Sequence, residues 1–363
     1  MKQRIKKIFS NVSESIDAII LKNSSEPFID KNFFYTISLE HGLFEGCSAV
    51  LYPEGNIDVI VSELESESAK KSDNNIKIYK KQKDFYEMLR ETIKSSKNIG
   101  LNFNCITLKD FLKFEKELPN KNFVDISSTL MKTRMVKDEL EIKKIRKATE
   151  IVDKAMLKIP EVVHEEMYEY ELAAEINNLI QKNGAGGIAF DTISSFGKNT
   201  AEPHYSHGKT KLKDGDFVLC DFGACYERYN SDITRTFVFG KASEKQKNMH
   251  NTVLKAQKIG FDKIKSGIEA HFVHDSVNEF INKSKFRGRF IHSTGHSLGL
   301  NVHDGGIGFN EESRVLLEKN MVLTVEPGVY IPGFGGVRIE DDIIVKKDGL
   351  EILTKSTRDL IEI

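Results

Sequence analysis

Hydrophobic and polar residues follow a strand-and-helix alternation in the first part of the chain. Short apolar runs with strand-like composition are separated by helical stretches such as KDFYEMLRETIKSS. The strand-like runs are AIILK, FFYTI, CSAVLYPEG, IDVIVSE, IKIYKK and NIGLN. Ile5, Ile8, Phe9 and Val12 are spaced as on one face of a first helix. This alternation predicts a mixed α/β domain over residues 1–128.

The pattern changes near residue 130, where strand-like FVDI gives way to a long helical periodicity. From there the spacing of apolar residues predicts two helices before one hairpin and two more helices before a second hairpin. The four predicted helices cover residues 137–157, 168–183, 244–266 and 270–284. We therefore expect a second, internally doubled domain over residues 129–363.

Two aspartates lie in the first predicted hairpin, DFVLCDFGACYERYNSDITRTFVFG. Apolar runs precede and follow the turn ERYN, and Asp221 and Asp232 fall one in each arm. If the arms pair antiparallel about this turn, we expect the carboxylates to be directly opposed, with Cβ atoms roughly 4.5 to 5.5 Å apart. Like charges at this distance repel, so either one carboxylate carries a proton or a metal ion binds between them.

The second predicted hairpin, MVLTVEPGVYIPGFGGVRIEDDIIV, contains a second pair of acids, Glu326 and Glu340, across a Gly/Pro-rich connection. Between the two hairpins, HSTGHSLGLNVHD gathers His292, His296 and His303, although the chain has only 10 histidines. Neither half of the domain contains all of these side chains. A site built from them therefore lies where the two halves meet.

The four acids and His296 form an oxygen-rich ligand set with a single imidazole. Such a set suits Mn²⁺, Co²⁺ or Zn²⁺. It has too few nitrogens for a structural zinc site and too many for a dedicated calcium site. Five side chains are more than one ion needs, and bridging carboxylates can hold two metals about 3.5 to 4 Å apart. The residues therefore predict a dinuclear metal centre.

Five segments follow one another between residue 130 and the C-terminus: AEPHYSHG, DFGACYERYNSDITRTF, HSTGHSLGLNVHD, LTVEPGVYIP and GGVRIEDD. In this order they resemble the metallopeptidases of the pita-bread fold, which include methionine aminopeptidase, aminopeptidase P and prolidase. The resemblance implies an α+β fold: a pita-bread domain of doubled helices and a bent antiparallel sheet, after a smaller mixed α/β domain. It also implies two divalent metal ions, most readily Mn²⁺ or Co²⁺, with Zn²⁺ or Fe²⁺ as alternatives.

The resemblance, carried over position by position, implies the metal ligands. Asp221 and Asp232 would hold one ion, and His296 and Glu326 would hold the other. Asp232 and Glu340 would bridge both ions. Glu326 would in addition carry a proton from the attacking water to the leaving nitrogen.

Further roles follow from the same resemblance. His204 and His303 would contact the substrate and stabilise the oxyanion, and His292 would line the pocket. For Arg338 two roles are equally open. It would either anchor a substrate carboxylate or form an ion pair that orients Glu340 or Asp341.

The substrate class implied is a proline-containing peptide, because PHYSHG, HSTGHSLGL and GGVRIEDD resemble peptidases that cleave Xaa-Pro bonds. The terminal LTKSTRDL resembles prolidase, which acts on dipeptides, whereas VHDGG resembles aminopeptidase P, which acts on longer peptides. We expect a prolidase first and an aminopeptidase P second, with a non-catalytic interaction protein on the same fold as a third alternative. By analogy, the N-terminal domain implies a homodimer.

Composition bears on the partners and the compartment. The formal net charge is -1 and no nucleic-acid-binding signature accompanies the Lys-rich runs, so we expect no nucleic-acid partner. The first residues lack the uninterrupted apolar core of a signal peptide, and no later segment is expected to span a membrane. The 4 cysteines lack CxxC spacing, which predicts reduced thiols and a cytoplasmic protein.

Overall fold

The computed structural model describes residues 2–363. Contacts divide the chain into two compact units, Met1–Arg134 and Met135–Ile363. The sequence placed the domain boundary between residues 128 and 129, and helix α6 (Ser127–Met135) runs across that position. None of the described helices is long and apolar enough to cross a bilayer.

The N-terminal unit contains a six-stranded sheet in the order β4-β3-β2-β1-β5-β6. The pairs β1–β2 and β2–β3 are antiparallel, and the other three pairs are parallel. The strands are β1 (Ala18–Lys22), β2 (Ser48–Leu51), β3 (Ile57–Ser62), β4 (Asn75–Tyr79), β5 (Asn98–Leu101) and β6 (Asn122–Asp125). The helices before α6 are α1 (Lys2–Asn11), α2 (Lys31–Ile37), α3 (Ser66–Ala69), α4 (Gln82–Thr92) and α5 (Leu108–Glu117). The predicted mixed α/β domain is confirmed, although the run FFYTI, expected to be strand-like, lies in helix α2.

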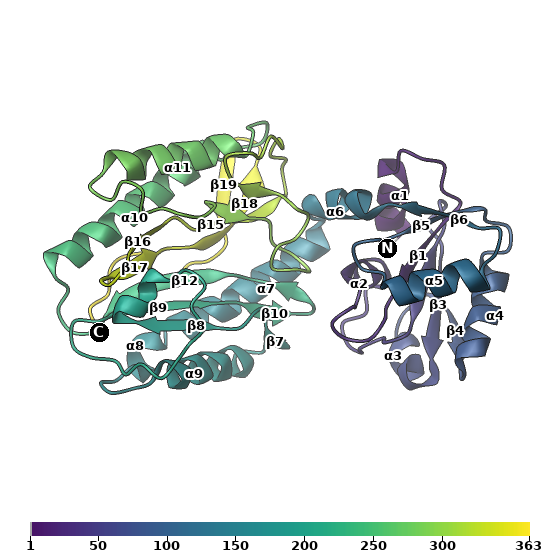
Figure 1. The fold of residues 1–363 in the computed structure, drawn as a ribbon, viewed down its shortest axis with the longest axis horizontal. Coiled ribbons are helices and arrows are strands. Elements are labelled where there is room, and N and C mark those ends of the chain that lie inside the picture. Colours follow the sequence, from purple (N-terminus) through teal and green to yellow (C-terminus); the bar gives the residue numbers. More distant parts are fainter. Residues whose placement is uncertain (1) are drawn as a thin grey trace. The chain divides into compact units, whose positions relative to one another are not determined.

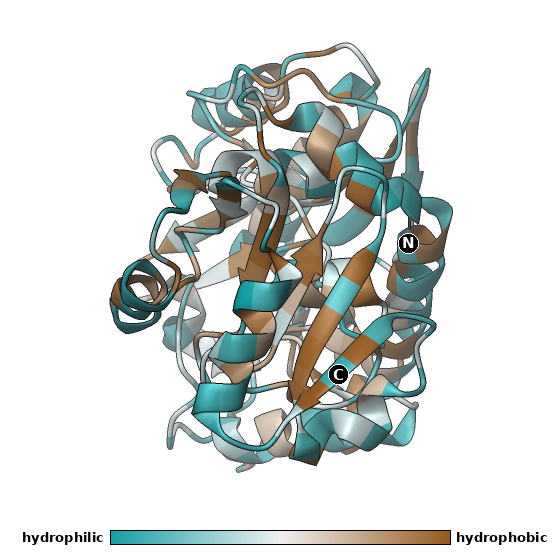
Figure 2. Ribbon diagram, turned by 90° about the vertical axis from the view of Figure 1, so that its right-hand side faces the viewer, coloured by the Kyte–Doolittle hydropathy of each residue, from teal (hydrophilic) through white to brown (hydrophobic). Residues whose placement is uncertain are grey.

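Burial explains why these strands are visible in the sequence. Strand β1 is buried along its whole length, and the core packs Ile20 and Ile99 of the sheet against Phe85 of α4 and Phe114 of α5. Figure 2 shows strands that are mostly hydrophobic and helices with hydrophilic turns beside hydrophobic ones. Strands covered by helices lose the alternation of polar and apolar residues and appear as continuous apolar runs.

The C-terminal unit places its strands between two groups of helices. Figure 1 shows α10 and α11 on one side of the strands and α8 and α9 on the other. The helices are α7 (Glu139–Met156), α8 (Ile159–Val162), α9 (Glu169–Lys182), α10 (Glu244–Lys263) and α11 (His271–Lys283). Apart from the short α8, they correspond to the four predicted helices. The doubled arrangement is therefore confirmed.

The strands of this unit form small antiparallel sheets in the orders β12-β9-β8, β11-β10-β7, β15-β18-β19, β16-β17 and β13-β14. Their bounds are β7 (Gly187–Ile188), β8 (Ile193–Phe196), β9 (Phe217–Phe222), β10 (Ala224–Tyr226), β11 (Tyr229–Asn230), β12 (Ile233–Val238), β13 (Gly295–His296), β14 (Gly308–Phe309), β15 (Val322–Val325), β16 (Gly328–Ile331), β17 (Gly335–Arg338), β18 (Asp341–Lys346) and β19 (Gly349–Ile352). The backbone N–H of Glu340 donates to the carbonyl of Thr234 at 3.1 Å. This bond joins the Asp hairpin to the Glu hairpin.

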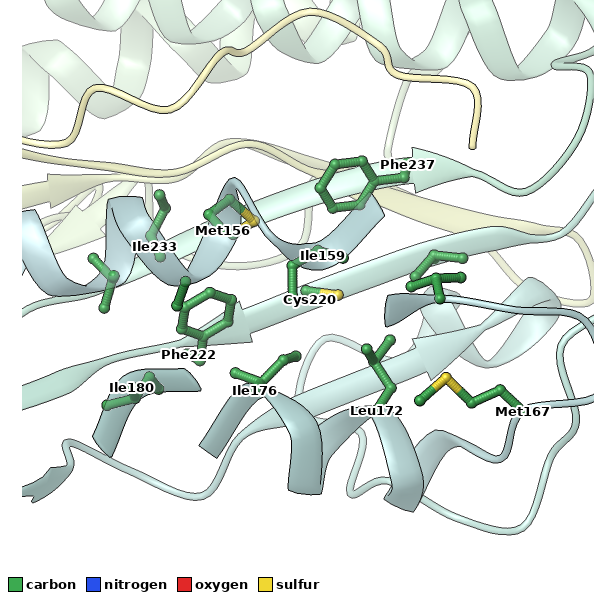
Figure 3. Close-up of a cluster of buried hydrophobic side chains, with 14 of the residues drawn as sticks. Met156, Ile159, Met167, Leu172, Ile176, Ile180, Cys220, Phe222, Ile233 and Phe237 are labelled. Atoms are coloured by element: carbon green, nitrogen blue, oxygen red, sulfur yellow. The ribbon is translucent and has the colours of Figure 1, made fainter. Parts of the chain in front are cut away.

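Strand β9 turns one face to the core and the other to the site. Val218, Cys220 and Phe222 belong to a buried cluster with side chains of α7 and α9, and Figure 3 shows Phe222 among those helices. Burying each large apolar side chain stabilises the fold by about 1.5–3 kcal/mol. Because successive residues of a strand point to opposite faces, this packing directs Asp221 away from the cluster.

The register of the first hairpin differs from the prediction. Asp221 is paired with Thr234, and the turn is centred on Glu227 and Arg228, which both have positive φ. Direct opposition of Asp221 and Asp232 would need a turn centred one residue earlier. The predicted pairing partner of Asp221 was therefore wrong by two residues, Asp232 instead of Thr234. The two aspartates are diagonal neighbours on one face of the hairpin.

The second hairpin contains the directly opposed pair. Val325 is paired with Asp341 on one side, and Gly328 is paired with Arg338 on the other. Extending this register places Glu326 opposite Glu340, in the short interval between the two ladders. The Gly/Pro-rich connection predicted between the two acids thus contains strands β16 and β17.

Candidate metal centre

A cavity of about 490 Å³ in the C-terminal unit is lined by residues of both hairpins. The side chains that the sequence singled out all line it, namely His204, Asp221, Asp232, His292, His296, His303, Glu326, Arg338 and Glu340. The other lining residues are Phe190, Ile193, Pro203, Ser293 and Val302. The cavity thus combines a charged part with a mostly apolar part.

Three of the predicted ligands form a compact group. Asp232, His296 and Glu340 each offer one ligand atom, and these atoms lie within 4.8 Å of one another. His296 Nε2 is 3.6 Å from Asp232 Oδ2 and 3.5 Å from Glu326 Oε1. This spacing of carboxylates and one imidazole is that of side chains able to share a metal ion.

Several buried carboxylate oxygens at this site have no hydrogen-bond partner among the described residues: Asp221 Oδ1, Asp232 Oδ1 and Glu340 Oε1. Burial and repulsion by neighbouring acids raise the pKa of Asp232 and Glu340 well above the usual range. Burial also raises the pKa of Glu326 to about 7. Buried anions without partners are costly unless a cation compensates them. The residues present therefore fit divalent metal ions.

Arg338 is an ion-pair partner at this site, but not of the acids proposed for it. Its Nη2 forms an ion pair with Asp221, and its Nε donates to Thr234 Oγ1 at 3.2 Å. Thr234 Oγ1 in turn donates to Glu340 Oε2 at 2.6 Å. Asp341, the other acid proposed as a partner, points to the opposite face of its strand and is paired with Arg235.

His292 is held as a neutral imidazole with a defined tautomer. Arg338 Nη1 donates to Tyr330 Oη at 3.0 Å. The Tyr330 hydroxyl donates to His292 Nε2, 2.8 Å away, because the proton of this neutral ring is on Nδ1. Nδ1 of the same ring donates to the carbonyl of Ser293 at 2.8 Å. Burial and the charge of Arg338 lower the pKa of His292 to about 3. The ring therefore accepts one hydrogen bond and donates the other.

His204 and His303 reach the cavity from two loops. The ring centroids of His296 and His303 are 4.1 Å apart, and burial lowers the pKa of both imidazoles. His204 follows the 3₁₀ turn Gly197–Ala201. Buried Glu169 braces that loop by accepting from Tyr205 Oη at 2.9 Å. A neutral imidazole can ligate a metal or donate to a substrate oxygen.

Comparison with known proteins places this centre in a family. Residues 143–347 match Metallopeptidase family M24, and residues 4–136 match the Creatinase/Prolidase N-terminal domain. The chain belongs to metallopeptidase family M24. Membership of M24 implies divalent metal ions, in agreement with the donor set of the cavity.

Relatives within M24 match along the whole chain. The "Xaa-Pro dipeptidase" of Pyrococcus horikoshii is 38% identical over 364 residues, which cover 99% of each chain. The crystal structure of an X-Pro aminopeptidase from Thermotoga maritima has a TM-score of 0.91 and 32% identity, covering 96% of this chain and 98% of that one. The prolidase structure from P. horikoshii has a TM-score of 0.89 and 35% identity, covering 99% and 100%. The predicted pita-bread fold is thereby confirmed.

Three residues that the sequence did not single out contact the predicted M24 ligands or their neighbours. Besides Tyr330 and Thr234, Asp342 accepts the backbone N–H of Asp232 at 2.9 Å. Weak signals existed, since Thr234 lies two positions from Asp232 and Asp342 lies two positions from Glu340, each on the same strand face as that ligand. Tyr330 lies in the GVYI run after Glu326, and nothing in its spacing pointed to His292.

Proposed function

We propose that this chain is a dinuclear metal-dependent peptidase that hydrolyses Xaa-Pro dipeptides, that is, a prolidase. The observation that carries the proposal is the set of buried carboxylate oxygens without described hydrogen-bond partners in the cavity. Buried anions of this kind call for cations. The cavity volume of about 490 Å³ lies in the range of small-ligand sites and supports a small peptide as substrate.

The residues proposed to hold the two ions are the five predicted ligands: Asp221, Asp232, His296, Glu326 and Glu340. Mn²⁺ or Co²⁺ suits this set best, and Zn²⁺ or Fe²⁺ is chemically acceptable. When bound, such ions generate a hydroxide nucleophile near neutral pH and polarise the scissile carbonyl. Arg338 and Thr234 keep Asp221 and Glu340 oriented for this task.

Side chains of the chain transfer the proton of the attacking water and stabilise the negative charge that develops on the carbonyl oxygen. Glu326 takes the proton of the attacking water and delivers it to the proline nitrogen as the bond breaks. His204 and His303 donate to the oxyanion of the tetrahedral state, which strengthens their bonds in the transition state. The neutral, oriented His292 lines the substrate pocket. A second role of Arg338, as the contact of a substrate carboxylate, stays a prediction.

The relatives support the substrate class. The two Pyrococcus proteins named "Xaa-Pro dipeptidase" match this chain along its length, at 38% and 35% identity. A second candidate, an Xaa-Pro aminopeptidase acting on longer peptides, is supported by the similarity to the T. maritima X-Pro aminopeptidase. The unpartnered buried oxygens argue against a non-catalytic interaction protein, because they would be a lasting cost without a cation.

The test starts from protein stripped with a chelator and reloaded with Mn²⁺, Co²⁺, Zn²⁺ or Fe²⁺. Release of proline from Met-Pro and Gly-Pro, but not cleavage of a longer Xaa-Pro-Xaa peptide, would establish a prolidase. Cleavage of the longer peptide would favour the aminopeptidase. Met-Ala serves as the control for the proline requirement. If no Xaa-Pro peptide is cleaved in a metal-dependent way, both the prolidase and the aminopeptidase proposals are refuted.

A homodimer is part of the proposal and is supported by the match to the Creatinase/Prolidase N-terminal domain. Light scattering at micromolar concentration should give twice the mass of the 41.2 kDa chain. A mass equal to one chain would contradict it.

A cytoplasmic location is likewise proposed. Cys47, Cys105, Cys220 and Cys225 are all free thiols in the structure, as expected in a reducing compartment. Fractionation of cells that express the protein, followed by immunodetection, tests the location. Recovery outside the cytoplasmic fraction would rule it out.

A further inference from the structure

The loop 297–304 directly follows His296 of the cavity wall and contains His303, also of the cavity wall, as its second-last residue. We call this segment the histidine loop. Its ends are tied together: the backbone N–H of Asp304 donates to the Ser297 carbonyl at 2.9 Å, and Ser297 Oγ donates to the Asp304 carbonyl. The positions of both imidazoles therefore depend on the position and conformation of this closed loop.

A buried ion pair holds the histidine loop from one side. Lys137 Nζ lies 3.3 Å from Asp304 Oδ2, and both side chains are 0% exposed. The same carboxylate oxygen accepts the backbone N–H of Leu300 at 3.3 Å. Lys137 is itself fixed, since its N–H donates to Asn320 O at 3.0 Å and the next residue, Asp138, caps helix α7. The loop is thus anchored to a rigid helix start.

Two further contacts hold the histidine loop in place. A Cβ at Gly299 would lie 2.1 Å from Asp304 Oδ2 and 3.1 Å from Lys137 Cε, so the loop backbone packs directly on the ion pair. From β11, Asn230 donates its backbone N–H to Gly299 O at 2.9 Å and its side-chain amide N–H to Leu300 O at 3.1 Å. Asn230 lies two residues before Asp232, which couples the loop to the Asp hairpin.

We propose that Lys137 and Asp304 are positioning residues, which seat the histidine loop so that His296 and His303 both face the cavity. A buried ion pair is seldom more stable than apolar residues of similar volume, so stability alone does not explain this one. One carboxylate oxygen binds the Lys137 ammonium and the Leu300 N–H together, which fixes a single loop arrangement. The inference rests on the proposed metal centre, through His296.

The test compares Co²⁺ binding to native protein and to the double variant Lys137→Met/Asp304→Asn. Removing both charges leaves neither one buried alone, and the two replacements are close in volume to the originals. We expect a folded protein whose Co²⁺ dissociation constant is raised about 10- to 100-fold. The visible Co²⁺ spectrum should change at saturation, because the His296 nitrogen is displaced. For hydrolysis, kcat should fall more than KM changes, because His303 acts in the transition state.

The control is Arg146→Met/Glu351→Gln, which removes a partly exposed ion pair between α7 and β19. It should leave Co²⁺ binding and kcat unchanged. If the Lys137/Asp304 variant does not fold, Gly299→Ala decides, because its methyl group displaces the Asp304 carboxylate while leaving both charges in place. That variant should also weaken Co²⁺ binding.

Native Co²⁺ affinity and spectrum in the folded double variant, or in Gly299→Ala, would overturn the inference. A native protein that binds no Co²⁺ would overturn it together with the metal centre. Co²⁺ titration needs no substrate. A native protein that binds Co²⁺ but cleaves no Xaa-Pro peptide would therefore refute the proposed function alone, and the binding data would still decide the role of the ion pair.

Discussion

Glu340 and Asp341 are adjacent, both almost completely buried, and opposite in their hydrogen bonding. Glu340 Oε1 has no partner among the described residues, and its Oε2 accepts from Thr234. Both oxygens of Asp341 are satisfied, by donors from Arg235, Gln257, Thr354 and Arg358. Burial alone therefore does not identify a metal ligand. The unsatisfied acid is the candidate for a cation, and the satisfied acid is part of the framework.

The two acids face different parts of the unit because strand residues alternate. Glu340 faces the cavity. Asp341 faces a network in which Arg235 also donates to the carbonyls of Thr357 and Ser356 in the C-terminal segment. The framework acid thus ties the C-terminal segment to strand β18, which begins directly after Glu340. Substitutions at the two positions should separate catalysis from stability.

The largest effect is expected from Glu340→Gln. Loss of a ligand charge should reduce kcat by more than about 100-fold, the upper limit typical for residues that only support a ligand. In the chelator-treated protein the same change should raise the melting temperature, because one of several repelling buried carboxylates becomes neutral. Peptide hydrolysis, metal content and thermal unfolding measure the three effects. Unaltered metal content would remove Glu340 from the ligand set.

Asp341→Asn should lower the stability of the fold and leave metal binding unchanged. It leaves Arg235 and Arg358 without their carboxylate partner, and breaking a buried ion pair costs about 3–5 kcal/mol. Urea unfolding in the presence of chelator measures this loss, and metal content per folded molecule should stay native. A stable Asp341→Asn protein that has lost its metal would show that the two acids are not functionally distinct.

The sequence allowed the candidate acids and the doubled helices to be predicted, because alternation and helical periodicity are local properties. It did not define the register of the Asp hairpin. That register depends on Glu227 and Arg228, which adopt positive φ although hairpin turns of this kind usually contain glycine or asparagine. Nor did it define the partner of Arg338, since Asp221 lies 117 positions away. Such a contact depends on how two hairpins pack, which no local pattern encodes.

The region around Arg235, the partner of Asp341, also makes the stability of the fold depend on pH. His250 on α10 is buried, and burial is the main reason that its pKa is lowered to about 4, with Arg235 adding to the effect. The unfolded chain binds a proton near pH 6.5 and the folded chain does not. The contribution of His250 to stability should therefore decrease by up to roughly 3 kcal/mol as the pH falls from 6.5 to 4.

Urea unfolding of native protein and His250→Gln at several pH values isolates this effect from that of the carboxylates. The variant should lose less stability than the native protein over the same range. Equal losses in both proteins would mean that His250 is protonated in the folded state, and hence that the network around Arg235 is more accessible to water than its burial indicates.

The smallest expected effect is the stabilisation by metal. Mn²⁺ at about 100 times its dissociation constant should stabilise the native protein by about 2.7 kcal/mol, provided that the unfolded chain does not bind it. Mn²⁺ should stabilise Asp341→Asn by the same amount, although this variant is less stable without metal, because its ligands are intact. Mn²⁺ should stabilise Glu340→Gln by less. Thermal unfolding with and without Mn²⁺ at fixed pH makes the comparison. An equal gain in Glu340→Gln would mean that the cation stabilises the fold from another position, and the unsatisfied oxygen of Glu340 would then need a different partner.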